Sequence, residues 1–396
     1  MQMSELSALL TREGLALLDE LGPVGSASDV ARAVSRLRAA GHSPDLVSAV
    51  VGQAHLRVKA RDKFGEFAER MLFTRAGLEQ ATRLGVAALH AVRMRQAGIA
   101  RVADLGCGIG GDSLAFAAAG LRVDAVDADE VTAAIAAYNL APFGDAVTVR
   151  HAAADAAPAG DSASAVWLDP ARRTAGHSET RRVAASDYSP ALDWCLDLAT
   201  RMPTGIKLGP GLDRDLVPSD VEAQWVSADG SVVELVLWSR ELAREGIRRA
   251  ALVVHGDRTD EITAPADAED EPVRPLGAYL HEPDGAVIRA RLIGEAARML
   301  DAGMLDESIA YLTGDAALTS PFVQSFRVRE TMPAHVKTIN AALRAHDIGR
   351  LEIKKRGMDV DPAAFRKKLS LRGSQQATLI LTRTSGGRVA ILADRV

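Results

Sequence analysis

The sequence predicts an α/β protein: a Rossmann-like parallel sheet of seven strands, a helical region before it and a small α+β domain after it. Three observations support this prediction. Apolar side chains recur at helical spacing up to about residue 95, and short apolar runs then alternate with helical segments over about 150 residues. Residues 321–396 mix strands with two helices. Alternation of strand and helix is typical of a parallel sheet covered on both faces.

The helical region is expected to contain several short helices. Leu18 and Leu21 share one apolar face, Val30 and Val34 share the next, and Gly22 interrupts the pattern between them. The strands of the sheet are expected at 102–105, 123–127, 147–150, 165–169, 205–208, 223–226 and 232–238. Because only residues 227–231 separate the last two strands, we expect a hairpin that closes one edge of the sheet.

The C-terminal part is expected to begin with an exposed loop. Residues 255–275 carry seven acidic side chains, two arginines and three prolines without apolar periodicity, and 286–300 reads as an amphipathic helix. The expected tail elements are strand 325–330, helix 335–346, strand 351–356, helix 362–369, and strands 378–383 and 388–393. The predicted domains are a helical region at 1–70, the sheet domain at 71–255, a linker with helices at 256–320 and the α+β domain at 321–396.

A glycine-rich loop follows the first predicted strand. In Asp-Leu-Gly-Cys-Gly-Ile-Gly-Gly at 104–111, Gly106, Gly108 and Gly110 allow the backbone to approach a ligand where a Cβ would collide. The ligand would lie at the start of the next helix, at the carboxyl edge of the sheet. Asp104 adds a carboxylate to the same strand end. The sequence therefore predicts a ligand site at this turn.

Two kinds of ligand fit this loop. Gly106, Gly108 and Gly111 have the spacing of a dinucleotide fingerprint, and the acidic Asp127 follows. A pyrophosphate, however, would be repelled by the carboxylate of Asp104, whereas S-adenosylmethionine carries an ammonium and a sulfonium that the carboxylate attracts. We expect S-adenosylmethionine, and a dinucleotide or a ligand-free tight turn are the alternatives.

Further acidic side chains follow the second and third strands. Asp127 ends the second strand, where its carboxylate can accept both ribose hydroxyls of a bound nucleoside. Asp129 competes for this role, with capping of the next helix as its other reading. Asp155, after the third strand, is placed to accept the adenine amino group, or is a polar loop residue. Before the loop, Gln80 and Thr82 are candidates for the methionyl end of the donor, with Thr82 as a plain helix cap almost as well supported.

The fourth strand ends in a polar turn at 169–173. Methyl transfer is an in-line displacement that depends mainly on alignment of nucleophile, methyl and sulfur. Asp169 could accept a hydrogen bond from an attacking amine, and Pro170 fixes the turn. Arg172 and Arg173 would meet phosphates or a carboxylate of the substrate, or pair with acids on the surface.

Composition narrows the class of protein. Among 396 residues, 47% are apolar, which suffices for full-sized cores, and no apolar stretch approaches the ~18 residues of a membrane span. The N-terminus lacks a signal-peptide pattern, so a cytoplasmic protein is expected. Cys107 and Cys195 are too few for a four-ligand metal site, so no metal is expected.

Charge is distributed unevenly along the chain. The net charge is −5, but residues 348–373 carry eight basic and three acidic side chains, a net +5 that leaves −10 elsewhere. This pattern is typical of a local anion-binding face. The candidates for substrate contact, besides Arg173, are Lys354, Lys355, Arg356, Arg366, Lys367 and Lys368.

With these residues identified, the region of about 70–255 resembles class I S-adenosylmethionine-dependent methyltransferases. The segments 104–111, 123–127 and 168–172 appear in that family's order and spacing. The whole chain is similar to bacterial proteins that join a helical N-terminus, this catalytic domain and a THUMP-like domain, and Glu-Gln-Ala-Thr at 79–82 is similar to an element of trimethylguanosine synthases. Residues 279–289 and 351–357 carry the THUMP-like resemblance, which implies RNA binding.

The resemblance implies an enzyme that methylates RNA, on a base nitrogen of tRNA or rRNA, with Asp169, Pro170 and Arg172 in catalysis. One departure concerns the base. Families that methylate exocyclic nitrogens usually have an aromatic residue at the end of the Asp-Pro-Pro motif, where this chain has Arg172 after Ala171. A stacking ring is worth ~1–3 kcal/mol, and a guanidinium plane can replace part of it. Methylation of a protein or small molecule, or binding of donor and RNA without turnover, are the alternatives.

Overall fold

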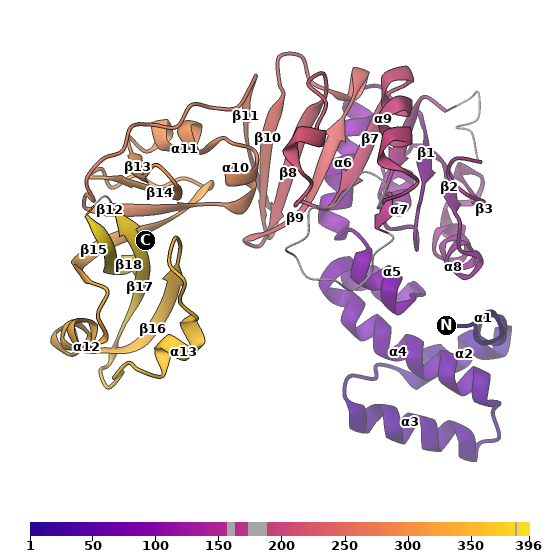
Figure 1. The fold of residues 1–396 in the computed structure, drawn as a ribbon. Coiled ribbons are helices and arrows are strands. Elements are labelled where there is room, and N and C mark those ends of the chain that lie inside the picture. Colours follow the sequence, from indigo (N-terminus) through magenta and orange to yellow (C-terminus); the bar gives the residue numbers. More distant parts are fainter. Residues whose placement is uncertain (157–162, 173–187, 385) are drawn as a thin grey trace. The chain divides into compact units, whose positions relative to one another are not determined.

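The computed structural model describes residues 1–156, 163–172, 188–384 and 386–396 (Figure 1). The chain divides into two compact units. Unit 1 comprises residues 1–208, 212–221 and 236–244, and unit 2 comprises residues 209–211, 222–235 and 245–396. No helix of the described residues is both long and apolar enough to cross a bilayer.

Unit 1 begins with helices, as the sequence predicts. They are α1 (Met3–Leu9), α2 (Arg12–Leu21), α3 (Ala27–Ala39), α4 (Pro44–Phe64), α5 (Arg75–Gln80) and α6 (Leu84–Gln96), with the 3-10 helix η1 (Gly65–Arg70) after α4. Thr11, Ser26 and Ser43 cap α2, α3 and α4 with side-chain oxygens that accept backbone N–H groups. The long helix α4 packs against α1, α2 and α3 (Figure 1).

A parallel sheet with alternating helices follows. Its strands in unit 1 are β1 (Arg101–Leu105), β2 (Arg122–Asp127), β3 (Val147–His151), β4 (Ala165–Leu168) and β7 (Thr204–Leu208). β1 pairs in parallel with β2 and β4, β2 with β3, and β4 with β7. The helices between them are α7 (Gly111–Ala118), α8 (Glu130–Leu140) and α9 (Leu192–Arg201). The predicted parallel α/β sheet is confirmed, and the carboxyl ends of β1, β2, β4 and β7 share one edge.

The edge of the sheet differs from the prediction. In hydrogen-bonding order the strands are β3, β2, β1, β4, β7, β9, β8, β10 and β11, so the β8–β9 hairpin is present but does not close the sheet. The added elements are β8 (Glu222–Ala228), β9 (Ser231–Trp238), β10 (Arg249–His255) and β11 (Arg258–Ala264). β11 replaces part of the loop expected at 255–275. Only Ile262 and Ala264 of β11 are buried, so the sequence lacks the apolar pattern of a strand.

Unit 2 contains a second sheet, in the order β13, β14, β12, β15, β18, β17, β16. Its strands are β12 (Tyr279–Pro283), β13 (Gly303–Asp306), β14 (Ile309–Gly314), β15 (Val323–Pro333), β16 (Ile348–Lys355), β17 (Gln375–Thr384) and β18 (Gly387–Arg395). Its helices are α10 (Gly285–Arg289), α11 (Ile293–Met299), α12 (Val336–Ala345) and α13 (Pro362–Arg366). The strands and helices expected after residue 321 are all present. The single helix expected at 286–300 is instead two, because Arg291 adopts φ +59° between them.

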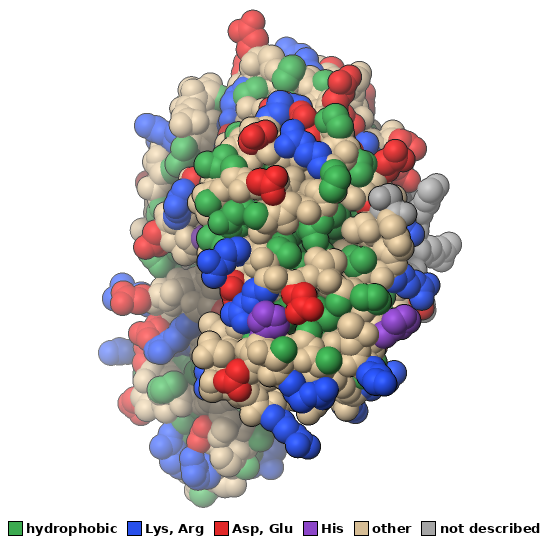
Figure 2. Space-filling model, turned by 90° about the vertical axis from the view of Figure 1, so that its left-hand side faces the viewer, with side chains coloured by type: hydrophobic (Ala, Val, Ile, Leu, Met, Phe, Trp, Pro, Cys, Tyr) green, Lys and Arg blue, Asp and Glu red, His purple; other side chains and the backbone are tan. Residues whose placement is uncertain are grey.

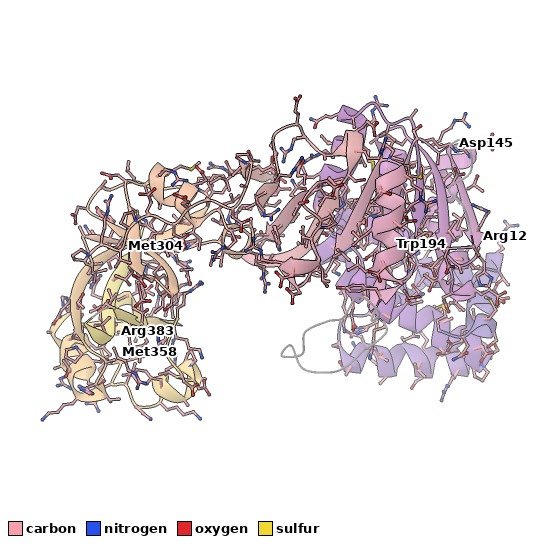
Figure 3. All side chains as sticks on the ribbon, turned by 45° about the horizontal axis from the view of Figure 1, so that its top comes forward. Arg12, Asp145, Trp194, Met304, Met358 and Arg383 are labelled. Atoms are coloured by element: carbon pink, nitrogen blue, oxygen red, sulfur yellow. The ribbon has the colours of Figure 1, made fainter. Side chains whose placement is uncertain are left out.

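Short elements complete the description. They are the paired strands β5 (Ala171–Arg172) and β6 (Tyr188–Ser189), and the 3-10 helices η2 (Ala141–Ala146), η4 (Arg214–Leu216) and η5 (Arg240–Leu242). Figure 3 labels side chains from both units, among them Trp194 on α9, Met304 on β13, Arg383 on β17 and Met358 in the loop after β16.

An aromatic cluster fills the core beside β4 and β7. The ring of Trp167 lies 5.6 Å from that of Trp238 and 5.7 Å from that of Phe116, measured between centroids. Gly205 on β7 leaves room for these rings, because a Cβ there would lie 2.6 Å from Trp167. A central strand therefore contains glycine where the neighbouring strand contains tryptophan.

Two buried amides attach the segment before α5 to its neighbours, one on α8 of the sheet domain and one on α4. Asn139 on α8 accepts a hydrogen bond from the backbone N–H of Leu72 (2.8 Å) and donates to the carbonyls of Leu72 (3.0 Å) and Ile109 (2.9 Å). Gln53 on α4 exchanges two similar bonds with Phe73. Since all these groups are buried, each bond replaces water that the backbone would otherwise require.

The substitution Asn139→Ala should lower the free energy of unfolding by about 2–4 kcal/mol, because three buried backbone groups lose their partner. Denaturant unfolding measures this loss. The matched control is Asn340→Ala in unit 2, where a half-buried amide bonds the backbone of Lys368 and Ser370 and about 1 kcal/mol is expected. Equal losses in the two variants would contradict the role given to Asn139.

Candidate functional site

The glycine loop joins β1 to α7 in a conformation that favours glycine. Gly106, Gly108 and Gly110 have φ values of +100°, +56° and +87°. A Cβ on Gly106 would lie 3.1 Å from the carbonyl oxygen of Asp169, so the loop passes directly against the turn after β4. A Cβ on Gly108 would meet no described atom within 4 Å. The loop is therefore packed on one side and open at its centre.

Asp104 is buried at the carboxyl end of β1. One carboxyl oxygen, Oδ2, accepts a hydrogen bond from the Ser113 hydroxyl (2.5 Å), and Oδ1 is buried without a hydrogen bond from any described residue. Burial raises the pKa of Asp104 to about 8, and the nearby carboxylates of Asp112 and Asp169 add to this effect against the opposing influence of Ser113 and Lys207. A cation close to Asp104 would favour its ionised form.

The structure separates the roles of the two acids after β2. Asp127 accepts hydrogen bonds from the backbone N–H groups of Gly108 (3.0 Å) and Asp129 (2.9 Å), and burial raises its pKa. Asp129 is the N-cap of α8, where its Oδ1 accepts from both the backbone N–H and the hydroxyl of Thr132. Asp127 thus touches the glycine loop, and Asp129 performs the capping function that the sequence left open for it.

Thr82 belongs to a buried polar network and caps no helix. The N-cap of α6 is Arg83, whose side chain makes no capping bond. The Thr82 hydroxyl donates to Oδ2 of Asp112 (2.8 Å) and accepts from Nζ of Lys207 (2.9 Å). Nδ1 of His90 lies 2.9 Å from the other oxygen of Asp112. Thr82, His90, Asp112 and Lys207 are all less than 10% exposed.

The charges in this network are mutually compensated. Burial acts to raise the pKa of Asp112, but Lys207, His90 and Thr82 outweigh it and hold that pKa well below its usual range. At neutral pH, Asp112 on α7 is therefore ionised. The nearby Asp104 on β1, with a pKa of about 8, is mostly protonated. The His90 ring packs 4.5 Å from the ring of Trp167, which orients it from the core side.

Asp169 joins this network at its exposed end. Its Oδ2 lies 2.6 Å from Nζ of Lys207, and its side chain is 37% exposed, compared with 9% for Lys207. Pro170 is buried directly after it. The backbone of Arg172 forms β5, and Arg173 lies outside the described residues. Because the Asp169 carbonyl also lies against Gly106, the turn predicted after the fourth strand contacts the glycine loop.

Two candidates lie apart from these contacts. Gln80 is exposed at the last residue of α5, and Asp155 is exposed in the turn after β3. Their predicted contacts with the donor stay predictions.

The basic candidates of unit 2 fall into two groups. Lys354 and Arg356 pair with Glu282 at 2.5 and 3.5 Å, and Arg366 donates to the carbonyl of Leu351. Lys355, Lys367 and Lys368 are exposed, and none of the three has an ion pair with a described residue. In Figure 2, blue and red side chains are interspersed over the face shown, so the surface is not uniformly basic.

Sequence reasoning missed His90, Asp112 and Lys207. Asp112 occurs in α7, whose other residues are apolar, small or Ser, and Lys207 occurs in a strand of five buried residues. A charged residue in an otherwise buried element requires a partner, and this was the available signal. His90 gives no such signal, because one histidine on a helix face is compatible with many environments.

Known proteins resemble this chain over most of its length. Two uncharacterized S-adenosylmethionine-dependent methyltransferases of Mycobacterium tuberculosis, from strains CDC 1551 / Oshkosh and ATCC 25618 / H37Rv, are 34% identical over 367 residues, or 90% of this chain and 97% of each relative. Residues 323–395 match the THUMP domain-like family, and residues 2–60 match a domain of unknown function (DUF8688).

A solved structure has the same fold. The crystal structure of a candidate methyltransferase from Porphyromonas gingivalis W83 superposes with a TM-score of 0.73 and 20% identity, covering 90% of this chain and 92% of that one. The identity to the M. tuberculosis relatives and this shared fold together confirm the class I resemblance inferred from the sequence. The chain belongs to the S-adenosylmethionine-dependent methyltransferases.

Proposed function

We propose that this methyltransferase acts on RNA, at a base nitrogen of tRNA or rRNA. The observation that carries the proposal is the match of residues 323–395 to the THUMP domain-like family, because THUMP domains imply RNA binding. Exposed lysines within the same segment supply positive charge for phosphates. A nitrogen acceptor is proposed because the carboxylate of Asp169, at the turn after β4, offers a hydrogen-bond acceptor to an amine.

The glycine loop and its acids fit S-adenosylmethionine. The buried Oδ1 of Asp104 lacks a described partner, and an ammonium or sulfonium nearby would compensate its charge. Gly106, Gly108 and Gly110 have no Cβ and adopt positive φ, and the space beside Gly108 is open. Asp127, already fixed by the Gly108 N–H, is the residue we assign to the ribose hydroxyls.

Asp169 is the residue we assign to the acceptor nucleophile. When bound, the donor supplies an electrophilic methyl group on a sulfonium, so the protein must mainly align the nucleophile. A carboxylate at the turn after β4 accepts a hydrogen bond from an attacking N–H and directs its lone pair, and the released proton passes to Asp169 or water. Pro170 is buried behind it and restricts the backbone of the turn.

Three lysines form the candidate phosphate-binding surface of unit 2. Side chains alternate along a strand, so Lys355 lies on the same face of β16 as Leu351 and Ile353, which pack with Phe365 of α13 in one apolar cluster. Lys367 and Lys368 directly follow α13. We call Lys355, Lys367 and Lys368 the lysine cluster. Lys354 and Arg356, on the opposite face, share an ion pair with Glu282, which offsets part of their charge.

Donor affinity should depend on pH through Asp104. Because the pKa of the buried carboxyl is about 8 and a bound cation favours its ionised form, binding below pH 8 should release a proton. The Kd for S-adenosylmethionine is expected to fall as pH rises from 5.5 to 7.5, by up to about tenfold per unit. Calorimetry in two buffers of different ionisation enthalpy measures both effects. In Asp104→Asn the proton release should vanish; release that persists there would assign it to another group.

Asp127 and Asp129 form a matched pair of acids at the same loop. Asp127→Ala should weaken S-adenosylmethionine about 10- to 100-fold, because charge-assisted hydrogen bonds to the ribose are lost. Asp129→Ala should cost about 1 kcal/mol of stability through the lost cap, with less than about threefold change in Kd. Titration calorimetry and thermal unfolding of both variants separate the roles. The reverse ranking in Kd would transfer the ribose contact to Asp129.

Transfer to RNA is the direct test of the proposed function. With a radiolabelled methyl donor, total tRNA and rRNA from a strain lacking this gene should incorporate label in the presence of the enzyme. Asp169→Ala should abolish incorporation and bind the donor as the wild type does. If label enters only the protein or small-molecule fraction, RNA is not the substrate and the proposal is wrong.

The lysine cluster should account for part of RNA binding. Changing its three lysines to Gln should lower the salt dependence of RNA binding by about 2–3 in the log–log slope, at roughly 0.7–0.9 per phosphate contact. The control changes three exposed arginines of the N-terminal helices, Arg12, Arg36 and Arg38, to Gln. An equal effect of both triple variants would mean that only net charge matters.

A further inference from the structure

Lys207 is a buried cation in a central strand. It is the fourth residue of β7, in which all five residues are buried, and only 7% of its surface is exposed. Burial of an ammonium is costly unless several partners replace its water, so its position requires an explanation beyond packing.

The partners of Lys207 come from three separate elements. Its Nζ donates to the Thr82 hydroxyl before α6 (2.9 Å), lies 3.6 Å from Oδ2 of Asp112 on α7 and lies 2.6 Å from Oδ2 of Asp169 after β4. Asp112 is itself fixed by Thr82 and His90. Thr82 and Asp112 thus hold the ammonium from the core side, and Asp169 pairs with it on the other side.

Exposure rises along this network toward the turn. The side chains of His90, Asp112 and Lys207 are 2%, 8% and 9% exposed, whereas that of Asp169 is 37% exposed. The backbone of Asp169 lies against Gly106 of the loop. The network therefore begins against Trp167 in the core and ends at Asp169, the most exposed of these side chains.

We propose that Lys207 is a positioning residue for methyl transfer: its ammonium, anchored by Asp112 and Thr82, fixes the orientation of the Asp169 carboxylate beside the glycine loop. The inference rests on the proposed role of Asp169 in the acceptor site. Lys207 itself contacts no substrate in this scheme. The ion pair commits Oδ2 of Asp169 to Lys207, so the carboxylate cannot rotate freely when the acceptor binds.

Two other charged groups near Lys207 have partners of their own. Asp104 on β1 accepts a hydrogen bond from the Ser113 hydroxyl. Lys63 on α4 donates to the carbonyls of Leu78, Glu79 and Ala81 at 2.7–2.8 Å, which holds the end of α5 next to Thr82. Lys63 is therefore committed to the backbone, whereas Lys207 pairs with Asp169.

The test compares Lys207→Met with Lys207→Arg in RNA methylation with labelled S-adenosylmethionine. In Lys207→Met, kcat should fall at least about tenfold, while KM for RNA and Kd for the donor change less than about threefold. Lys207→Arg keeps a cation and should recover kcat to within about fivefold of the wild type. The structural control is Thr204→Val on the same strand, which loses a partly buried hydrogen bond from the Thr204 hydroxyl to the Met202 carbonyl and should lower stability without changing kcat.

Two further variants make the outcome decisive. Asp169→Asn should lower kcat at least as far as Lys207→Met does, because it removes the carboxylate that Lys207 orients. If Lys207→Met does not fold, Asp112→Asn, which leaves Lys207 less firmly anchored, should still lower kcat severalfold. Loss of the ion pair should also shift the 13Cγ NMR signal of Asp169, identified by its absence in Asp169→Asn, in Lys207→Met but not in Thr204→Val.

The outcomes separate the two proposals. Full activity of Lys207→Met, or of Asp112→Asn if only that variant folds, together with an inactive Asp169→Asn would overturn the role of Lys207 alone. Full activity of Asp169→Asn would overturn the role of Asp169 and this inference with it. An unshifted 13Cγ signal in Lys207→Met would show that the ion pair does not control the carboxylate, even if the RNA substrate proves wrong.

Discussion

A single ammonium group balances the acidic edge of the sheet. Asp104, Asp112 and Asp169 approach one another where β1, α7 and β4 meet, and burial acts to raise the pKa of both Asp104 and Asp112. Lys207 pairs with Asp112 and Asp169, and together with His90 and Thr82 it holds the pKa of Asp112 well below its usual range. Asp104 has no such ion pair, and burial raises its pKa to about 8. The cluster therefore contains a carboxylate that Lys207 keeps charged, Asp112, and a carboxyl whose charge can respond to a ligand, Asp104.

The fold was predictable where local pattern and tertiary environment agree. The glycine loop, the parallel strands and the tail elements have the composition that their environment requires, and all are present. The prediction was wrong at 258–264 and at 286–300. β11 is an edge strand with few buried side chains, so its stability comes from backbone pairing with β10. Amino-acid composition does not predict this kind of pairing. The break between α10 and α11 depends on the left-handed backbone at Arg291. Arginine rarely adopts this conformation, so the residue type gave no reason to predict it.

The site was predictable only in part, for a related reason. Gly106, Asp127 and Asp169 follow strand ends in order along the chain, and parallel strands bring their carboxyl ends to one edge. Thr82, Asp112 and Lys207 are separated by up to 125 residues and meet only through packing of α6, α7 and β7. In the sequence Thr82 is compatible with a cap, and the structure assigns that position to Arg83 instead. Likewise, Lys354 and Arg356 belong to a basic run in the sequence, but both pair with Glu282, more than 70 residues earlier, which offsets part of their charge.

The hydrogen bonds of the Asn139 amide bear on which part of the chain is needed for an active enzyme. It bonds Leu72 and Ile109 at once, while Gly77 of α5 lies so close to Ile109 that a Cβ would come within 2.5 Å of its side chain. The glycine loop is therefore shaped partly by residues that precede the sheet, and Gln53 ties those residues to α4. A shortened gene that starts at the first strand would remove α6, whose side chains share one core cluster with the sheet, together with the segment that supports the loop, so we expect the smallest active fragment to retain the N-terminal helices.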